Sequence, residues 1–219
     1  MAEQTFPDYE LEHACYRSGY PCVCGIDEAG RGPLAGPVFA AAVILPPDCD
    51  IPVLNDSKKL SPKKREQLFD VILDKAVAYS VASASEREID ELNILEATFL
   101  AMRRAVDGLA VRPDMALIDG NRKPGLSLPE KTVVKGDARS MSIAAASVLA
   151  KVSRDRYMLE MAQLYPEYQF EKHKGYGTKL HYQMLAQYGV SEIHRKSFLK
   201  TLDANIQRIQ KAEKETTGE

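Results

Sequence analysis

Residues 25–33 are Gly25-Ile26-Asp27-Glu28-Ala29-Gly30-Arg31-Gly32-Pro33, which places two adjacent carboxylates directly before a glycine-rich turn that holds one arginine. The short stretch 22–26 precedes the acids and an apolar run follows the turn. Both are typical of strands, expected at about 23–27 and 36–45. Carboxylates beside apolar strands are unfavourable unless something pairs with them. Because no basic residue precedes Arg31 in this run, the stretch indicates a hard divalent cation as the partner.

The length of the chain, 219 residues, is ample for a sizeable core and predicts a single domain over 1–219. We expect its core at about 20–200, an N-terminal extension at 1–18 and a polar tail at 205–219. The 29 Lys and Arg residues nearly balance the 31 Asp and Glu residues. Composition alone therefore does not indicate a nucleic-acid binder, and any basic surface must be local.

Four cysteines occur at positions 15, 22, 24 and 49, without the spacing or the second pair of a zinc site. Reduced thiols in a cytoplasmic protein are the expectation. The N-terminus lacks a basic region followed by an apolar one. No stretch reaches the roughly 18 apolar residues that a membrane span needs, so no membrane association is predicted.

Apolar strand patterns alternate with helical ones along the chain, which predicts an α/β fold with a central sheet. Ser61 and Pro62 are typical of a helix start, and Leu95, Phe99, Met102 and Val106 recur at helical spacing. Further elements follow the same patterns: helices at 62–75, 93–108 and 142–165, strands at 77–84, 115–118 and 132–134, short helices after 191, and a frayed end at 211–219.

Four carboxylates fall at the ends of predicted strands. Asp27 and Glu28 end the first strand, Asp119 ends the strand at 115–118, and Asp137 follows the strand at 132–134. Strand ends present side chains to a shared crevice, so we expect these acids to gather in one site. An oxygen-only ligand set favours Mg²⁺ or Mn²⁺ over zinc.

Side chains alternate in direction along a strand, so Asp27 and Glu28 cannot both point into one site from regular strand geometry. Two alternatives remain open. Either the strand breaks at Glu28, or Glu28 reaches the metal partly through its backbone carbonyl.

Seven motifs in order closely resemble those of bacterial ribonuclease HII, and they cover residues 27–178. They are Asp27-Glu28-Ala29-Gly30-Arg31-Gly32-Pro33, Asp56-Ser57-Lys58-Lys59-Leu60-Ser61, Asp119-Gly120, Lys135-Gly136-Asp137, Ile143-Ala144-Ala145-Ala146-Ser147, Arg154-Asp155 and Lys174-Gly175-Tyr176-Gly177-Thr178. The resemblance implies a ribonuclease H-like central mixed sheet flanked by helices, with a small C-terminal helical extension. It also implies an endoribonuclease that cleaves RNA paired to DNA and incises at single ribonucleotides in duplex DNA.

The resemblance makes Asp27, Glu28, Asp119 and Asp137 the catalytic and metal-binding carboxylates, with Mn²⁺ or Mg²⁺ as cofactor. In two-metal hydrolysis one ion activates a water and the other stabilises the leaving 3′ oxygen, so no nucleophilic side chain is needed. The products would carry 5′-phosphate and 3′-hydroxyl ends. The sequence does not indicate which of the two metals is preferred.

Substrate choice must depend on the 2′-hydroxyl, which separates ribose from deoxyribose. The resemblance assigns its recognition to the turn Gly30-Arg31-Gly32, whose backbone groups are uncovered, and places Tyr176 against the following sugar. The alternative for Tyr176 is a loop aromatic that covers the core. Lys58 and Lys174 suit phosphate contacts, and Lys59 suits either a phosphate contact or a solvated face.

Several polar residues have simpler interpretations. Ser140 and Ser142 suit helix caps, and Arg154-Asp155 suits a buried ion pair that braces the long helix. His194-Arg195-Lys196 suits a solvated turn, or a contact to the duplex backbone. Lys63, Lys64 and Arg65 suit ordinary surface charge.

Two other functions share some of these features. A DNA-only nuclease or recombinase of the same wider fold would share the acids without needing Gly30-Arg31-Gly32 and Tyr176. A non-catalytic nucleic-acid-binding module would be hindered by acids that repel phosphate. The segment 208–219 lacks the glutamine, aliphatic and aromatic pattern of a replication-clamp-binding tail, so no such tail is predicted and a monomer is expected.

Overall fold

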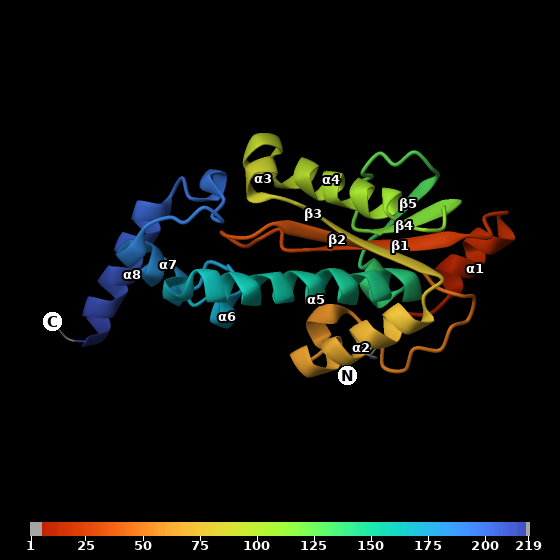
Figure 1. The fold of residues 1–219 in the computed structure, drawn as a ribbon, viewed down its shortest axis with the longest axis horizontal. Helices are drawn as coiled ribbons and strands as arrows, with labels where there is room; N and C mark the ends of the chain where they lie inside the picture. The colour runs from red at the N-terminus through yellow and green to blue at the C-terminus, as the bar shows by residue number, and fades with distance from the viewer. Residues whose placement is uncertain (1–5, 218–219) are drawn as a thin grey trace.

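The computed structural model describes residues 6–217, with side chains described up to Ile209. Its centre is a five-stranded sheet between two layers of helices (Figure 1). The strands lie in the order β3-β2-β1-β4-β5. Their bounds are β1 Val23–Ala29, β2 Val38–Ile44, β3 Ala78–Ala84, β4 Met115–Asp119 and β5 Glu130–Val133.

The sheet is mixed, as predicted. Strand β1 pairs antiparallel with β2, and β2 with β3, whereas β1, β4 and β5 run parallel to one another. In the register of β1 and β4, Ile26 lies opposite Ile118. Asp27 and Asp119, the next residue on each strand, therefore emerge side by side at the same edge of the sheet.

One face of the sheet is covered by the long helix α5, Met141–Leu164, and by α2, Pro62–Lys75 (Figure 1). Ala144, Ala145 and Ala146 of α5 are fully buried, and such small side chains let the helix approach the strands closely. Gly25 on β1 is required there, because a Cβ atom on it would lie 2.1 Å from the backbone carbonyl carbon of Ser142. The predicted helices at 62–75 and 142–165 are thus confirmed to within a residue.

The other face is covered by α4, Ile94–Asp107, preceded by α3, Glu86–Leu92. The Asn93 side chain caps α4, as the helix prediction for 93–108 required. Helix α3 was not predicted, although Ser85 and Glu88 form a capping box at its start.

The N-terminal helix α1, Glu10–Arg17, packs on the core through a buried carboxylate. Oε1 of Glu12 accepts hydrogen bonds from the Ser140 and Ser142 hydroxyls, both at 2.6 Å, and from the Ser142 amide at 3.0 Å. Ser140 is the cap of α5, as predicted, whereas the Ser142 hydroxyl holds Glu12 instead of capping the helix. Residues 1–5 of the expected extension lie outside the described residues.

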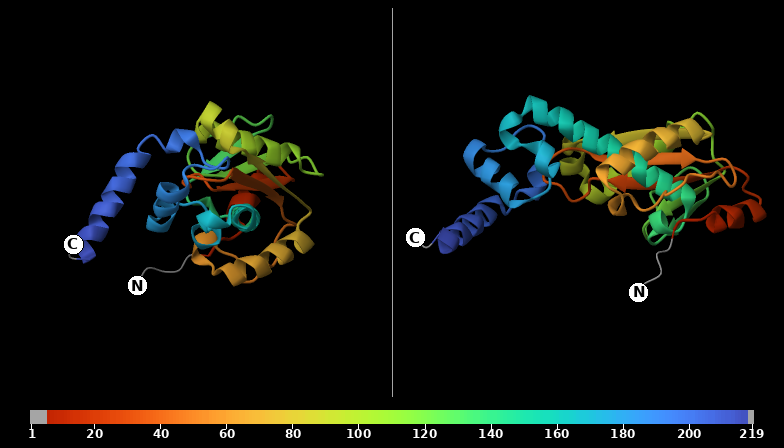
Figure 2. Two further views of the ribbon diagram at one scale, coloured as in Figure 1. Left: turned by 60° about the vertical axis from the view of Figure 1, so that its left-hand side comes forward. Right: turned by 90° about the horizontal axis from the view of Figure 1, so that it is seen from below.

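Three further helices gather at the far end of α5: α6 Phe170–His173, α7 Lys179–Tyr188 and α8 Leu202–Thr217 (Figure 2). The expected fraying from residue 211 is wrong as far as Thr217, where the helix continues, and residues 218–219 lie outside the described part. Among the described helices, none has both the length and the apolar character that crossing a membrane requires.

Candidate active site

The four predicted acids come from three neighbouring pieces of backbone. Asp27 and Glu28 lie on β1, Asp119 ends β4, and Asp137 lies in the short helical turn η2, Gly136–Ala138. The Gly136 amide donates a 2.7 Å hydrogen bond to Oδ1 of Asp119. This bond holds η2, and with it Asp137, beside the end of β4.

Strand β1 does not break at Glu28. Glu28 pairs with Ala40 and Ala29 with Phe39 in a regular antiparallel register, so the alternative of a broken strand is wrong. Ala29 packs among the residues facing α5, whereas Ile26 packs among those facing α4. By alternation, Asp27 faces the α5 side and Glu28 the α4 side.

Glu28 lies where two clefts meet. The first, here called the turn cleft, contains both β1 acids, and its lining is Asp27, Glu28, Ala29, Gly30, Arg31, Gly32, Ser57, Lys58, Lys151 and Tyr176. The second, the α4 cleft, is lined by Glu28, Arg31 and Asp119 together with Thr98 and Met102 of α4. The acids therefore surround the end of β1 from both faces of the sheet.

Burial and neighbouring charges raise the pKa of Asp27, Glu28 and Asp137. Burial, followed by the charges of Glu28 and Asp119, raises the pKa of Asp27 well above its ordinary value. Burial, followed by the charges of Asp56 and Asp119, raises the pKa of Asp137 to about 6. Burial also raises the pKa of Glu28, although Arg31, with Nη1 3.4 Å from Oε1, partly offsets this effect. Crowded negative charge of this kind is stabilised by a nearby cation.

The acids fit a hard divalent cation in their chemistry, because every donor is a carboxylate oxygen and their mutual repulsion favours a positive charge among them. Within the described side chains, no group of three or more His, Cys, Asp or Glu is already close enough to hold one ion. Binding a metal would therefore draw the carboxylates closer together, and the ligand assignment stays a prediction.

The glycine-rich turn and Tyr176 face each other across the turn cleft. A Cβ atom on Gly32 would lie 3.8 Å from Cε1 of Tyr176. Gly30 has a φ of +99°, a conformation that favours glycine. Tyr176 is 42% exposed and lines the cleft, so the alternative that it covers the core is wrong.

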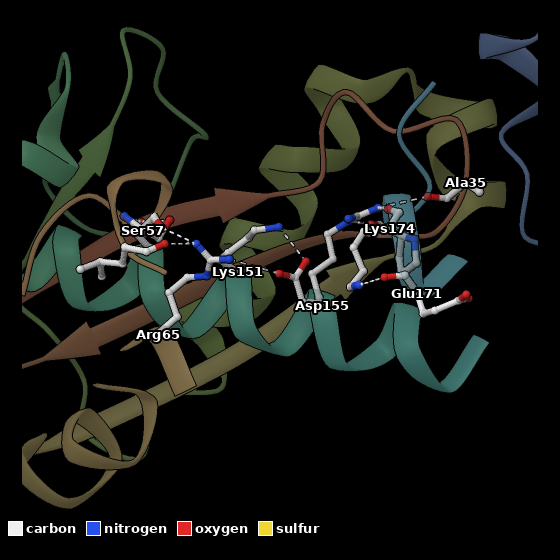
Figure 3. Close-up of polar contacts among 11 residues, drawn as sticks. Ala35, Ser57, Arg65, Lys151, Asp155, Glu171 and Lys174 are labelled. Carbon is white, nitrogen blue, oxygen red and sulfur yellow. Dashed lines mark hydrogen bonds and ion pairs between the residues drawn. The ribbon is translucent and has the colours of Figure 1, made fainter. Parts of the chain in front are cut away.

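The predicted lysines separate into two places. Lys58 lines the turn cleft, where burial lowers its pKa but the carboxylates of Asp27 and Asp137 raise it more. Lys174 lines an adjoining side cleft instead, and its Nζ donates to the Glu171 carbonyl (Figure 3). Lys151, which the sequence analysis missed, lines both clefts. Helical spacing gives no signal for it, because both of its neighbours, Ala150 and Val152, are buried apolar residues.

Two predicted surface or ion-pair roles are wrong in this region. Arg65 is not ordinary surface charge, because its Nη1 donates to the carbonyls of Ser57 at 2.7 Å and Leu60 at 2.6 Å (Figure 3). It thereby holds the turn that carries Lys58. Asp155 does not pair with Arg154 but with Lys151, at 2.6 Å, on the same face of α5 (Figure 3).

At the first two residues of the segment 194–196, both predictions, a solvated turn and a contact to the duplex backbone, are wrong. His194 is 2% exposed and Arg195 is fully buried. Arg195 turns inward because it donates to main-chain carbonyls of the glycine-rich turn, including that of Gly30 at 2.6 Å. Such a long-range partner leaves no trace in the local sequence.

The fold places the protein among ribonuclease H-type enzymes. It matches the crystal structure of the ribonuclease H2 from Pyrococcus horikoshii OT3 with a TM-score of 0.70 and 29% identity, covering 87% of this chain and 99% of that one. It also matches Bst-RNase HIII in complex with Mn²⁺, with a TM-score of 0.64 over 92% of this chain and 73% of that one. At 17% identity, the second match concerns the fold alone.

Sequence similarity narrows the class. The family model for ribonuclease HII matches residues 24–201. The ribonuclease HII of Caldicellulosiruptor saccharolyticus is 56% identical over 194 residues, which cover 89% of this chain and 95% of that protein. The chain belongs to the ribonuclease HII family and is a ribonuclease H-type hydrolase, as the sequence motifs predicted.

Proposed function

We propose that this enzyme hydrolyses the RNA strand of RNA/DNA hybrids and incises at single ribonucleotides embedded in duplex DNA. The observation that carries this proposal is the turn cleft. One cleft is lined by the acids Asp27 and Glu28, by the glycine-rich turn Gly30–Gly32 and by Tyr176. Groups suited to cutting a phosphodiester thus line the same cleft as groups suited to recognising a ribose.

Asp27, Glu28, Asp119 and Asp137 would hold two Mg²⁺ or Mn²⁺ ions. When bound, the metal supplies water activation and stabilisation of the leaving 3′ oxygen, so that 5′-phosphate and 3′-hydroxyl ends result. The chain's own residues fix the acids. Asp119 is oriented by the Gly136 amide, and Asp27 by the Glu28 amide, which donates to its Oδ1 at 2.7 Å. Lys58 and the half-exposed Arg31 suit the phosphates on either side of the cut.

Selection for ribose follows from the backbone polar groups of the turn. The Gly30 and Arg31 carbonyls accept hydrogen bonds from Arg195, so the groups that suit a 2′-hydroxyl are the main-chain N–H groups of Gly30–Gly32 and the Gly32 carbonyl. Tyr176 lies against Gly32 and suits contact with the next sugar. A deoxyribose in the same position would leave these polar groups unpaired, which is unfavourable when they are covered by substrate.

The proposal is tested with three duplexes that share one sequence: one with a single ribonucleotide, one RNA/DNA hybrid and one of DNA only. Each is incubated with Mg²⁺, with Mn²⁺ and with EDTA, and the product ends are identified by enzymatic labelling. We expect cleavage of the first two in both metals, 5′-phosphate ends, and no cleavage in EDTA. Cleavage of the all-DNA duplex would favour the DNA-only nuclease, and cleavage in EDTA would refute metal-dependent hydrolysis.

A further inference from the structure

The segment between β1 and β2 lacks the regular backbone hydrogen bonds of a helix or a strand. Residues 30–37 lie in neither a helix nor a strand, and the first three of them, Gly30 to Gly32, line the turn cleft. Gly30 and residues 33–37 are buried, and buried carbonyls need hydrogen-bond partners. Two buried arginines from distant parts of the chain provide them.

Arg195 binds carbonyls at both ends of the segment. Its Nη2 donates to the Gly30 carbonyl at 2.6 Å, its Nη1 to the Arg31 carbonyl at 3.0 Å, and its Nε to the Gly36 carbonyl at 2.8 Å. Backbone pairing supports this contact, because the Arg195 amide donates to the Leu34 carbonyl at 2.8 Å. The side chain is fully buried. One guanidinium thus joins both ends of the segment.

Arg154 of α5 binds the far half and joins it to the Tyr176 loop. Its Nη2 donates to the Ala35 and Lys174 carbonyls, both at 3.1 Å, and its Nε donates to the Pro37 carbonyl at 3.3 Å. Its guanidinium lies 5.7 Å from the centre of the Tyr176 ring. A Cβ atom on Gly30 would lie 2.1 Å from Arg154 Nε, so the turn and this arginine are in direct contact.

Both guanidinium groups are buried, and removing a charge from water is unfavourable unless well-oriented hydrogen bonds offset the desolvation cost. In the described part of the chain, neither has a carboxylate within ion-pair distance. The half-buried Glu86 at the start of α3 acts on both guanidinium groups electrostatically. Apolar side chains could fill this space without the desolvation penalty, but they could not fix several carbonyls at once.

We infer that Arg154 and Arg195 are positioning residues for ribose recognition: together they set the spacing between the Gly30–Gly32 turn and Tyr176. The inference rests on the proposed function, because it names what fixes the ribose-recognising groups. Neither arginine faces the substrate. Each acts through the backbone carbonyls that it binds, and Arg154 alone touches both walls of the turn cleft.

The planar fork of arginine makes the inference testable by conservative replacement. Lysine keeps the charge but cannot present a fork of donors to carbonyls in fixed directions. Arg195→Lys and Arg154→Lys should therefore loosen the turn without introducing a charge change. Arg195→Gln is a second variant that avoids an unpaired buried cation. The control is Arg104→Lys, an arginine that also donates to a carbonyl, that of Ser83 at 2.9 Å, but lies on α4 away from the turn.

The measurement is the ratio of dissociation constants for an all-DNA duplex and for the same duplex with one ribonucleotide, with Ca²⁺ in place of the catalytic metal. Melting temperatures are recorded in parallel. We expect the ratio to fall by about tenfold or more in the Arg154 and Arg195 variants, with the all-DNA affinity unchanged. A loss of this size corresponds to about one hydrogen bond between the turn and the ribose. The Arg104→Lys ratio should equal that of the wild type.

A purely structural role would lower the melting temperature and weaken binding of both duplexes equally, which leaves the ratio unchanged. Folded variants with a wild-type ratio would therefore overturn the inference, as would failure of all three variants to fold. A wild-type enzyme that does not distinguish the two duplexes would instead contradict the proposed function, and it would do so before any variant is measured.

Discussion

The C-terminal part of the molecule contains three buried histidines whose neutral state should make the protein sensitive to acid. His181 is fully buried, and His194 and His173 are 2% and 6% exposed. The rings of His173 and His181 stack with centroids 4.3 Å apart. They support the Tyr176 loop, because Nδ1 of His181 lies 3.0 Å from the Tyr176 carbonyl oxygen.

The hydrogen bonds assign one neutral tautomer to His181 and one to His194. The Ser191 amide donates to Nδ1 of His194, so the proton of His194 is on Nε2, which lies 3.0 Å from Nε2 of His181. His181 accepts there and donates from Nδ1 to the Tyr176 carbonyl. A second proton on either ring would meet a donor that already points at the same nitrogen. Protonation is therefore opposed by geometry as well as by burial.

Burial, followed by the charges of neighbouring histidines, lowers the pKa of His181 to about 3. Burial likewise lowers the pKa of His194 to about 4. A histidine with a lowered pKa in the folded state contributes stability that is present above its unfolded pKa of about 6.5 and is lost as the pH falls below it. At pH 5, which is about 1.5 units below the unfolded pKa, proton binding stabilises the unfolded state by about 2 kcal/mol for each such ring.

The perturbation that isolates this effect is His181→Asn. The free energy of unfolding of the wild type and of this variant is measured by urea denaturation at pH 7.5 and at pH 5.0. We expect the gap between the two proteins to narrow by about 2 kcal/mol at the lower pH, because only the wild type loses the contribution of His181. The pH-independent effect of the substitution cancels in this difference.

His13→Asn is the control, because His13 lies on α1, outside the cluster, and pairs with Asp48 at 2.9 Å. It should show no such narrowing. A constant gap between the wild type and His181→Asn across this pH range would refute the assignment of a neutral, donor-blocked His181. A gap that widened at pH 5 would mean that the ring is charged in the folded protein.

Four further outcomes are expected. Asp119→Asn should abolish cleavage while the fold persists by circular dichroism, because the amide oxygen can still accept from Gly136. Tyr176→Ala should reduce kcat/KM more for a single-ribonucleotide duplex than for a long RNA/DNA hybrid. Asp137→Asn should stabilise the metal-free protein at pH 7 by about 1–2 kcal/mol in urea denaturation. Because folding raises the pKa of Asp137 from 3.8 to about 6, this carboxyl destabilises the fold as the pH rises through that range. The loss is at most about 3 kcal/mol before solvent screening. Leu149→Ala, at a fully buried position of α5, should lower the free energy of unfolding by about 2–5 kcal/mol in the same assay.

Local patterns were sufficient to predict much of the fold. The side chains of Ser61 and Asn93 accept hydrogen bonds from backbone amides, and helices α2 and α4 begin where these caps indicate. Helix α3 was missed because its seven residues include one buried apolar side chain, Ile89, too few to show a period. Helix α1 was missed because it is short and its two buried residues are Cys15 and the carboxylate Glu12, which do not read as an apolar face.

The candidate site divides in the same way. The acids and the turn could be found in the sequence because each lies at a strand end or in a glycine motif. Arg195 could not, because its partners lie more than a hundred residues away and a buried arginine looks the same in a sequence as an exposed one. The Arg154-Asp155 pair misled for a related reason: adjacent residues on a helix point about 100° apart, so they seldom pair with each other.

Strand geometry also answers how Asp27 and Glu28, on opposite faces of β1, can serve one site. Strand β4 pairs with β1 only as far as Ile26, whereas β2 stays paired with β1 up to Ala29. In the described chain, the β4 side of β1 is therefore open beside both acids, and Asp119 lies at the rim of that opening. A site located off this open edge can be reached from both faces, so side-chain alternation places the two carboxylates around it instead of separating them. The continuous strand is thus compatible with both carboxylates taking part, and it makes a break at Glu28 unnecessary.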